Sequence, residues 1–337
     1  MEAEKKFIDD IARVDRSSFS IVTGLRAGIF AIAPLLLIPL VGYRGASFAA
    51  LGAMWLTNTE SPKSKMPLWI LLVACLSESL AVGLGTLAGT AGSIVPLLGG
   101  LGIFLPMLLH GNERWTRIGT YTAITFAMGV GLPGLSNAPF LRAFYSIVGT
   151  LWALAGISLQ RVIESRKARE GIKVSIKRFE LHPDAVRSAL TMGVASAFGF
   201  WIGMALGLPR DFWVVVTIII TVQPSFNSTL KFTSRMVLGT IAGALIGAAV
   251  LYSNQLYLEL ALLGVFAVLM FASRGVNLGL VQIFLAPFII VLLNFVYGGT
   301  ADFAEARVLD VAIGGVISLA TVYVLGLKAI KKYWKGA

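Results

Sequence analysis

Long apolar runs, separated by short polar segments, make up most of this 337-residue chain. A helix that crosses a membrane needs about 20 mostly apolar residues. The pattern predicts twelve spans, at residues 22–41, 46–58, 67–89, 93–109, 117–131, 140–160, 185–207, 211–222, 233–252, 256–272, 276–297 and 305–327. Three of these runs are short for a full crossing: 46–58, 117–131 and 211–222. Each of them could form a tilted helix, a helix extended by its polar flanks, or a re-entrant segment.

The composition agrees with a chain that lies mostly in lipid. Hydrophobic residues make up 57% of the sequence and charged residues 13%, whereas soluble domains average about 45–50% and about 25%. A soluble protein of this length needs far more polar residues to cover its surface. The composition therefore predicts an all-α integral membrane protein and excludes a soluble enzyme and a nucleic-acid binder.

The excess of basic residues is explained by membrane topology. The chain has 28 Lys and Arg against 17 Asp and Glu, and basic residues accumulate in cytoplasmic loops. If both termini lie inside, 22 basic residues fall on the inner side, four in outer loops and two within helix starts. This skew predicts a multi-pass protein of the cell membrane with both termini cytoplasmic, and it requires no nucleic-acid partner.

Several landmarks recur in the two halves of the sequence in the same order. Gly85-Thr86 is echoed by Gly239-Thr240, and an arginine followed seven residues later by glycine occurs at Arg142 and again at Arg307. These matches predict a six-helix repeat at 1–160, a basic cytoplasmic linker at 161–183 and a second six-helix repeat at 184–337. Because six is an even number, the two repeats should be parallel, and such repeats often hold a substrate site at their interface.

Four arginines lie at predicted helix ends, where each charge needs a reason. Arg26 and Arg187 occupy matching places near the inner ends of two spans, and Arg142 and Arg307 lie near outer ends. Guanidinium groups bind carboxylates and are always charged, so all four are candidate substrate-binding residues. For Arg26 and Arg187, extension of the side chain to lipid headgroups is the open alternative.

Two acidic residues are candidate proton-coupling groups. Glu78 lies in the middle of a span, flanked by Ser77 and Ser79, and either carries a proton or forms hydrogen bonds with these serines or a neighbouring helix. Asp310 follows Arg307 by three residues, a spacing that also allows a local ion pair.

The segment around the short run 211–222 adds two candidate substrate contacts. Trp213 either belongs to the aromatic belt at the membrane surface or forms a stacking surface for an aromatic substrate. Gln223-Pro224 predicts a helix break that exposes carbonyl groups, which is tolerated only beside water or protein.

No cofactor or metal is expected from the sequence. The chain has one cysteine and two histidines, too few for a Cys/His metal site. It also lacks the glycine-rich phosphate-binding motif of ATP-driven pumps. An enzymatic activity is therefore not expected.

The second half resembles a known family through a series of motifs. They are Ala-Val-Arg-Ser-Ala-Leu at 185–190, Gly-Leu-Pro-Arg-Asp-Phe-Trp at 207–213, Val-Gln-Pro-Ser at 222–225, Leu-Gly-Thr at 238–240, and Arg307 with Asp310 and Gly314. Their order resembles the fusaric acid resistance protein-like family of integral membrane transporters, which includes aromatic acid exporters. The resemblance implies six-helix units, export of organic acids, and kinship with plant aluminium-activated malate transporters, which are anion channels.

Together these features predict a secondary exporter of organic anions of the aromatic carboxylic acid type. The anion would pass along an arginine-lined pathway between the two repeats, in contact with membrane lipids. A passive anion channel and a non-transporting membrane scaffold are the alternatives. The sequence leaves open the substrate, the driving ion and whether two chains form a homodimer.

Overall fold

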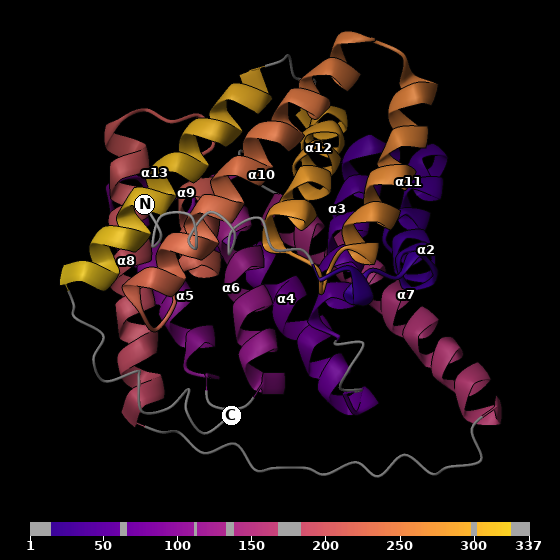
Figure 1. Ribbon diagram of the computed structural model, residues 1–337, viewed down its shortest axis with the longest axis horizontal. Helices are drawn as coiled ribbons and strands as arrows, with labels where there is room; N and C mark the ends of the chain where they lie inside the picture. Colours follow the sequence, from indigo (N-terminus) through magenta and orange to yellow (C-terminus); the bar gives the residue numbers. More distant parts are fainter. Residues whose placement is uncertain are drawn as a thin grey trace. The chain divides into compact units, whose positions relative to one another are not determined.

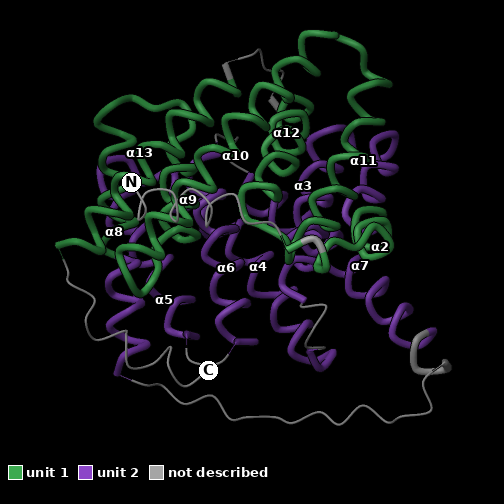
Figure 2. The backbone as a smooth tube through the Cα atoms, viewed as in Figure 1, with its two compact units in different colours: residues 1–29, 194–337 green, residues 30–193 purple. Residues whose placement is uncertain are grey.

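The computed structural model describes residues 15–60, 66–110, 113–132, 138–167, 183–297 and 302–324 (Figure 1). Within these ranges the chain forms helices joined by turns. The predicted all-α fold is therefore confirmed. The chain divides into two compact units, one formed by Met1–Ile29 with Val194–Ala337 and the other by Phe30–Gly193 (Figure 2).

Unit 2 contains the helices of the first half of the sequence. They are α3 (Ile38–Thr59), α4 (Leu68–Ala88), α5 (Val95–Met107), α6 (Glu113–Gly131) and α7 (Ala138–Lys167), with short 3₁₀ turns at Ala33–Leu37 and Gly92–Ile94. Helix α4 packs against α6 and α7, α3 packs against α7, and α5 packs against α6.

Unit 1 contains the helices of the second half together with the start of the chain. They are α9 (Phe212–Thr221), α10 (Phe226–Tyr252), α11 (Leu256–Ala272), α12 (Leu278–Tyr297) and α13 (Asp302–Val324), after a 3₁₀ turn at Arg16–Ser18. Helix α10 packs against α12 and α13, α9 packs against α13, and α11 packs against α12.

The division between the units falls inside two helices. Helix α2 (Ile21–Ile32) is divided after Ile29, and α8 (Pro183–Ala205) is divided after Gly193. In unit 1, Gly24 and Gly28 of α2 lie against Val268 of α11 so closely that side chains there would collide with its backbone. The boundaries of the compact units thus differ from those of the predicted repeats at 1–160 and 184–337. The two repeats stay a prediction.

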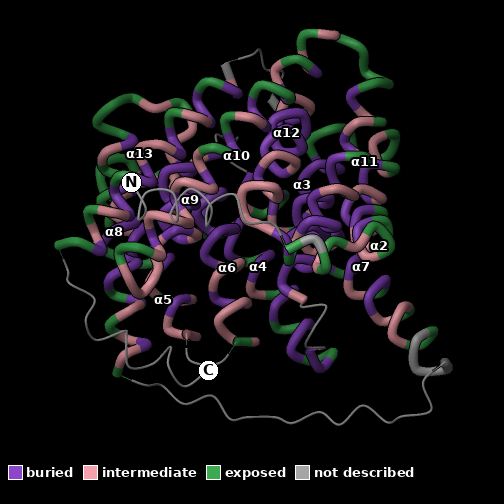
Figure 3. Tube along the Cα trace, in the orientation of Figure 1, coloured by how far each residue is buried: buried purple, intermediate pink, exposed green. Residues whose placement is uncertain are grey.

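Seven helical segments in the described ranges are long and apolar enough to cross a membrane. They are Ile21–Thr59, Leu68–Ala88, Ala138–Ile163, Pro183–Ala205, Phe226–Tyr252, Leu278–Val296 and Phe303–Val324. Many of their large apolar side chains, such as Leu36, Leu84 and Leu245, are exposed and suited to contact with lipid. Exposed and buried positions alternate along the helices (Figure 3). The prediction of a multi-pass membrane protein is confirmed.

Three apolar helices are shorter than a membrane span, and α9 is the shortest of them. The three segments are Gly92–Met107, Phe212–Thr221 and Leu256–Ala272. Ten residues of α-helix measure about 15 Å, half the thickness of the hydrocarbon core. The predicted break after α9 is present: Val222 is extended, and Ser225 caps α10 by accepting a hydrogen bond from the Ser228 backbone N–H.

Two glycines allow close helix packing where the charged residues lie. At Gly314 of α13, an added Cβ atom would lie 2.5 Å from the Val214 carbonyl oxygen of α9. At Gly149 of α7, an added Cβ atom would collide with the Ala49 carbonyl oxygen of α3. In each case the glycine lets a long helix that carries a buried arginine approach a second helix closely. The second helix carries the aromatic residue that lies beside this arginine.

Candidate functional site

The candidate site in unit 1 is a buried arginine stacked on a tryptophan. Arg307 of α13 is 2% exposed, and its guanidinium carbon lies 3.4 Å from the centroid of the Trp213 ring of α9. The close approach of α13 to α9 at Gly314 brings the two side chains together. Trp213 is itself 3% exposed and packs against Phe212 at a centroid distance of 4.5 Å. Its deep burial favours the predicted stacking role over a place in a surface belt.

A carboxylate lies one helical turn further along α13. Asp310 is completely buried, and neither of its carboxylate oxygens has a hydrogen-bond partner. The Nε and Nη1 atoms of Arg307 are also without partners. The two charges act on each other electrostatically but form no hydrogen-bonded pair. Buried charged groups normally have their hydrogen bonds satisfied. This site is an exception, because donors of its cation and acceptors of its anion are without partners.

The loop between α8 and α9 adds two more charged residues to this cluster. Arg210 lies over the Phe303 ring, 4.7 Å from its centroid. Asp211 is half-buried, and burial raises its pKa to about 6, although a hydrogen bond from the backbone of Phe212 opposes the shift. The charges of Arg210 and Asp211 both act on Asp310. The cluster therefore extends from the loop into the buried part of α13.

Unit 2 also holds a buried arginine, and its Nη1 atom, unlike that of Arg307, forms hydrogen bonds. Arg142 of α7 lies 5.1 Å from the centroid of the Phe48 ring of α3. Its Nη1 donates to the Thr86 hydroxyl at 3.0 Å and to the Leu132 carbonyl oxygen at 2.7 Å. This set of contacts joins α7, α4 and the end of α6.

Glu78 of α4 is completely buried and is held by α3. The Thr59 hydroxyl donates to its Oε1 at 2.5 Å, and its Oε2 has no partner. The flanking serines bond elsewhere, Ser77 to the Thr122 hydroxyl and Ser79 to the Thr150 hydroxyl. Of the two predicted partners for the Glu78 carboxyl, the flanking serines and a neighbouring helix, the structure shows the neighbouring helix. The second carboxyl oxygen stays available for a proton.

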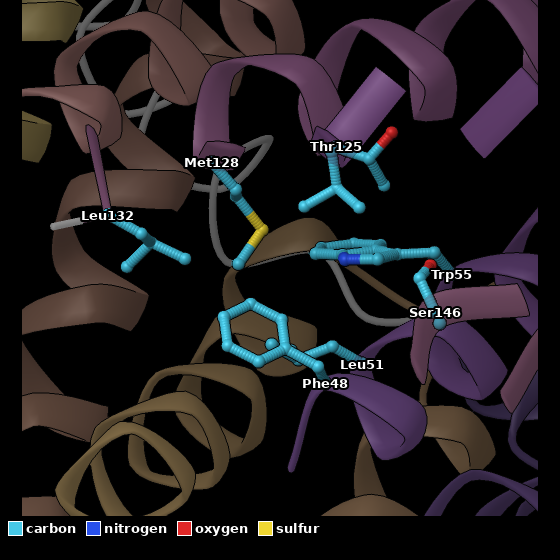
Figure 4. A pocket seen from close by; sticks show the side chains of 9 residues that line it. Phe48, Leu51, Trp55, Thr125, Met128, Leu132 and Ser146 are labelled. Carbon is cyan, nitrogen blue, oxygen red and sulfur yellow. The ribbon is translucent and has the colours of Figure 1, made fainter. Parts of the chain in front are cut away.

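A small cavity lies in unit 2 between α3, α4, α6 and α7. In Figure 4 the side chains of Phe48, Trp55 and Met128 surround it, with the hydroxyls of Thr125 and Ser146 near its edge. The volume open to the centre of a water molecule is about 10 Å³, which is room for about one water. An organic anion does not fit in this cavity without rearrangement.

Among the remaining predicted site residues, two are exposed and one is half-buried. Arg26 on α2 and Arg187 on α8 are exposed. Gln223 is half-buried after α9, where its side-chain amide donates to the Ile220 carbonyl oxygen at 3.3 Å. Among the predicted site residues of unit 1, the structure therefore brings together Arg307, Trp213 and Asp310.

Sequence reasoning missed two polar residues that lie in the interior of unit 1. Thr240 of α10 and Gln282 of α12 are 0% and 1% exposed, and the Thr240 Oγ1 and Gln282 Oε1 atoms have no hydrogen-bond partner. The repeated Gly-Thr step at 85–86 and 239–240 is the sequence signal that could have identified this threonine as a candidate site residue. In the described ranges, no group of three or more His, Cys, Asp or Glu side chains could hold a metal ion.

Comparison with known proteins agrees with the predicted resemblance. Residues 194–321 match the fusaric acid resistance protein-like family. This segment contains α9 and the part of α13 that carries Arg307 and Asp310. The resemblance read from the motifs of the second half is confirmed.

Curated relatives match less than half of the chain. The inner membrane protein YccS of Escherichia coli is 31% identical over 137 residues, which is 40% of this chain and 19% of that protein. An uncharacterized protein of Synechocystis is 26% identical over 147 residues, or 43% of this chain and 20% of the relative. One of Haemophilus influenzae is 26% identical over 135 residues, or 40% and 18%. The matches thus span about a fifth of each relative. No solved structure matches this chain.

Proposed function

We propose that this protein is a secondary transporter that exports organic anions, of the aromatic carboxylic acid type, across the cell membrane. The observation that carries the proposal is Arg307, a buried cation that is stacked on Trp213 and has two donor nitrogens without partners. A carboxylate on an aromatic body matches the chemistry of these two side chains, because guanidinium groups bind carboxylates and indole rings stack on aromatic rings. The matched family, to which aromatic acid exporters belong, supports the same substrate class.

The charge balance of the site favours coupling to protons. In the absence of substrate, Arg307 and Asp310 offset each other's charge. A bound anion leaves one uncompensated negative charge in the interior unless Asp310 takes up a proton, and an isolated buried charge is very unfavourable. Binding of one monoanion with one proton keeps the site neutral, and such coupled transport exports the anion when the outward anion gradient exceeds the inward proton gradient. We therefore assign substrate binding to Arg307 and Trp213, and proton coupling to Asp310.

We further propose the twelve-helix architecture of two six-helix repeats with both termini cytoplasmic. The helix pairs inside the two units support it: α4–α6, α4–α7, α3–α7 and α5–α6 in unit 2 correspond to α10–α12, α10–α13, α9–α13 and α11–α12 in unit 1. Gly149 against Ala49 corresponds to Gly314 against Val214. By this correspondence Arg142 matches Arg307, and Phe48, which precedes Ala49, matches Trp213.

The proposal gives the two matching arginines different roles. Arg142 holds helices together through Thr86 and Leu132, whereas Arg307 has donors left for a substrate. Arg26 and Arg187, the pathway between the repeats and a homodimer stay predictions, and the proposal involves no enzymatic step and no cofactor.

Transport by the reconstituted protein tests this proposal. We expect uptake of radiolabelled benzoate into proteoliposomes that is accelerated by a pH gradient, and loss of that uptake in Arg307→Gln. Arg117→Gln is the matched control, because it removes a partly exposed arginine that pairs with Glu113 of the same helix at 3.6 Å. Fast flux that ignores the pH gradient would indicate a channel. Absence of both flux and thermal stabilisation for a panel of aromatic carboxylates would favour the scaffold, and wild-type uptake in Arg307→Gln would refute the assigned site.

A further inference from the structure

The unused hydrogen-bonding atoms of unit 1 include one hydroxyl that the proposed function has not assigned. Thr240 of α10 is completely buried, and its Oγ1 neither donates to nor accepts from another group. A threonine inside a helix usually donates to the carbonyl oxygen four residues earlier, as Thr86 does to Val82 at 2.8 Å. Thr240 forms no such bond, so its hydroxyl remains available in the interior.

The packing of α10 on α13 places Thr240 beside the charged residues. Val237 of α10 lies near Gly315 of α13, 3.8 Å from the position of an added Cβ atom. One turn after Thr240, Ala244 packs in a cluster with Ala304 of α13. Thr240 lies between Val237 and Ala244 on this face, so it lies alongside the stretch of α13 between 304 and 315. That stretch carries Arg307 and Asp310.

The matching residues of unit 2 form the threonine–arginine hydrogen bond that is missing in unit 1. Thr86 occupies the same place in the Gly-Thr step as Thr240, and its hydroxyl accepts a hydrogen bond from Arg142 Nη1 at 3.0 Å. In unit 1 the same pair of residue types is present, but the Thr240 Oγ1 and Arg307 Nη1 atoms are both without partners. The threonine and the arginine thus lie on α10 and α13, which correspond to α4 and α7, but the hydrogen bond between the hydroxyl and Nη1 is not formed in unit 1.

We infer that Thr240 is the third ligand of the anion site, donating its hydroxyl hydrogen to one carboxylate oxygen of an organic monoanion that Arg307 binds. This inference rests on the proposed function and on the correspondence between the two units. A carboxylate has two oxygens and accepts several hydrogen bonds, so it can take donors from Arg307 and Thr240 together. Protonated Asp310 supplies a further donor. The site therefore selects a carboxylate over a neutral aromatic molecule of the same size.

Substitutions in the full chain test this inference. We expect Thr240→Val to raise the KM for benzoate uptake about tenfold, the usual effect of losing one hydrogen bond to a charged group. Thr240→Ser keeps the hydroxyl and should restore the KM to within about twofold. Thr86→Val is the matched control: it removes the hydroxyl that binds Arg142, so it should lower the melting temperature without changing the KM.

The outcomes separate this inference from the proposed function. A wild-type KM in Thr240→Val, together with loss of uptake in Arg307→Gln, would overturn the role of Thr240 and leave the transport proposal standing. Wild-type uptake in both variants would overturn both. If Thr240→Val does not assemble, Thr240→Ala gives the same test, read as the KM and as the rise in melting temperature on adding benzoate. Equal effects of Thr240→Ser and Thr240→Ala would also contradict the inference.

Discussion

The charge of Asp310 should link anion binding to protons, and Asp310→Asn removes that charge with little change in size. Arg307 and Asp310 are three residues apart on α13, a spacing that places such side chains about 6 Å apart. An anion bound to Arg307 lies at a similar distance from the carboxylate. With an effective dielectric constant of about 20, two like charges at about 6 Å repel by about 3 kcal/mol, or about a hundredfold in affinity.

Asp310→Asn should therefore bind the anion more tightly and without dependence on pH. At pH 7.5 we expect the KM for benzoate to fall by up to about a hundredfold, because the repulsion is absent. The ratio of uptake with and without an inward proton gradient should fall to about 1. Initial rates of radiolabelled benzoate uptake into proteoliposomes, measured from pH 5.5 to 8.5, give both quantities.

Two further variants make this experiment decisive. Asp211→Asn removes a half-buried carboxylate that also acts on Asp310, so it should change the KM only slightly, because solvent screens its charge. Asp310→Glu keeps an acidic group and should keep the response to the proton gradient. A variant Asp310→Asn that retains both the wild-type KM and the wild-type response to the gradient would refute the assignment of Asp310 as the coupled proton site.

Three other predictions concern stability and are read from melting temperatures in detergent. Gly314→Val should destabilise the protein by about 1–3 kcal/mol, because its Cβ would lie 2.5 Å from the Val214 carbonyl oxygen; an unchanged melting temperature would contradict the close packing. Arg161→Met should lower stability by about 2 kcal/mol, because it leaves the Glu60 carboxylate without its partly buried ion pair, and adding Glu60→Gln should recover part of the loss. Burial raises the pKa of Asp211 to about 6, so wild-type stability should decrease as the pH rises from about 4 to 6, since the folded state then holds the proton more tightly than the unfolded state. Asp211→Asn should remove that decrease, and an identical pH profile in both proteins would count against it.

The spans and the candidate charges could be predicted because both depend on local properties of the sequence. Apolar runs identify membrane helices since every backbone group in lipid must be paired within the segment. A charge inside or at the end of such a run is rare, so the sequence indicates Arg307, Asp310 and Glu78 as candidates, and the structure shows that all three are buried. Trp213 was found in the same way, from its place next to a short apolar run.

The partners of these residues could not be predicted, because they depend on how distant helices pack. Arg142 and Arg307 have the same spacing to a glycine, and nothing in that spacing distinguishes an arginine with formed hydrogen bonds from one with unused donors. The exposure of Arg26 and Arg187 likewise depends on which face of a helix its neighbours cover. The partner of Glu78 is Thr59, 19 residues away and on another helix.

The residue that follows each buried arginine by three positions differs between the two units, and this difference supports the proposal of proton-linked binding at Arg307. In unit 2 this residue is Tyr145, whose ring covers Gly45 of α3 so closely that a Cβ atom there would lie 2.9 Å from it. In unit 1 the same position holds Asp310, with both carboxylate oxygens unpartnered. A neutral tyrosine adds no charge beside Arg142, whereas a carboxylate beside Arg307 leaves a pair of charges: a proton can neutralise Asp310, and an anion can neutralise Arg307. In the proposed function, Arg142 therefore serves stability and Arg307 serves binding, and we propose that this difference follows from a single tyrosine or aspartate one turn away.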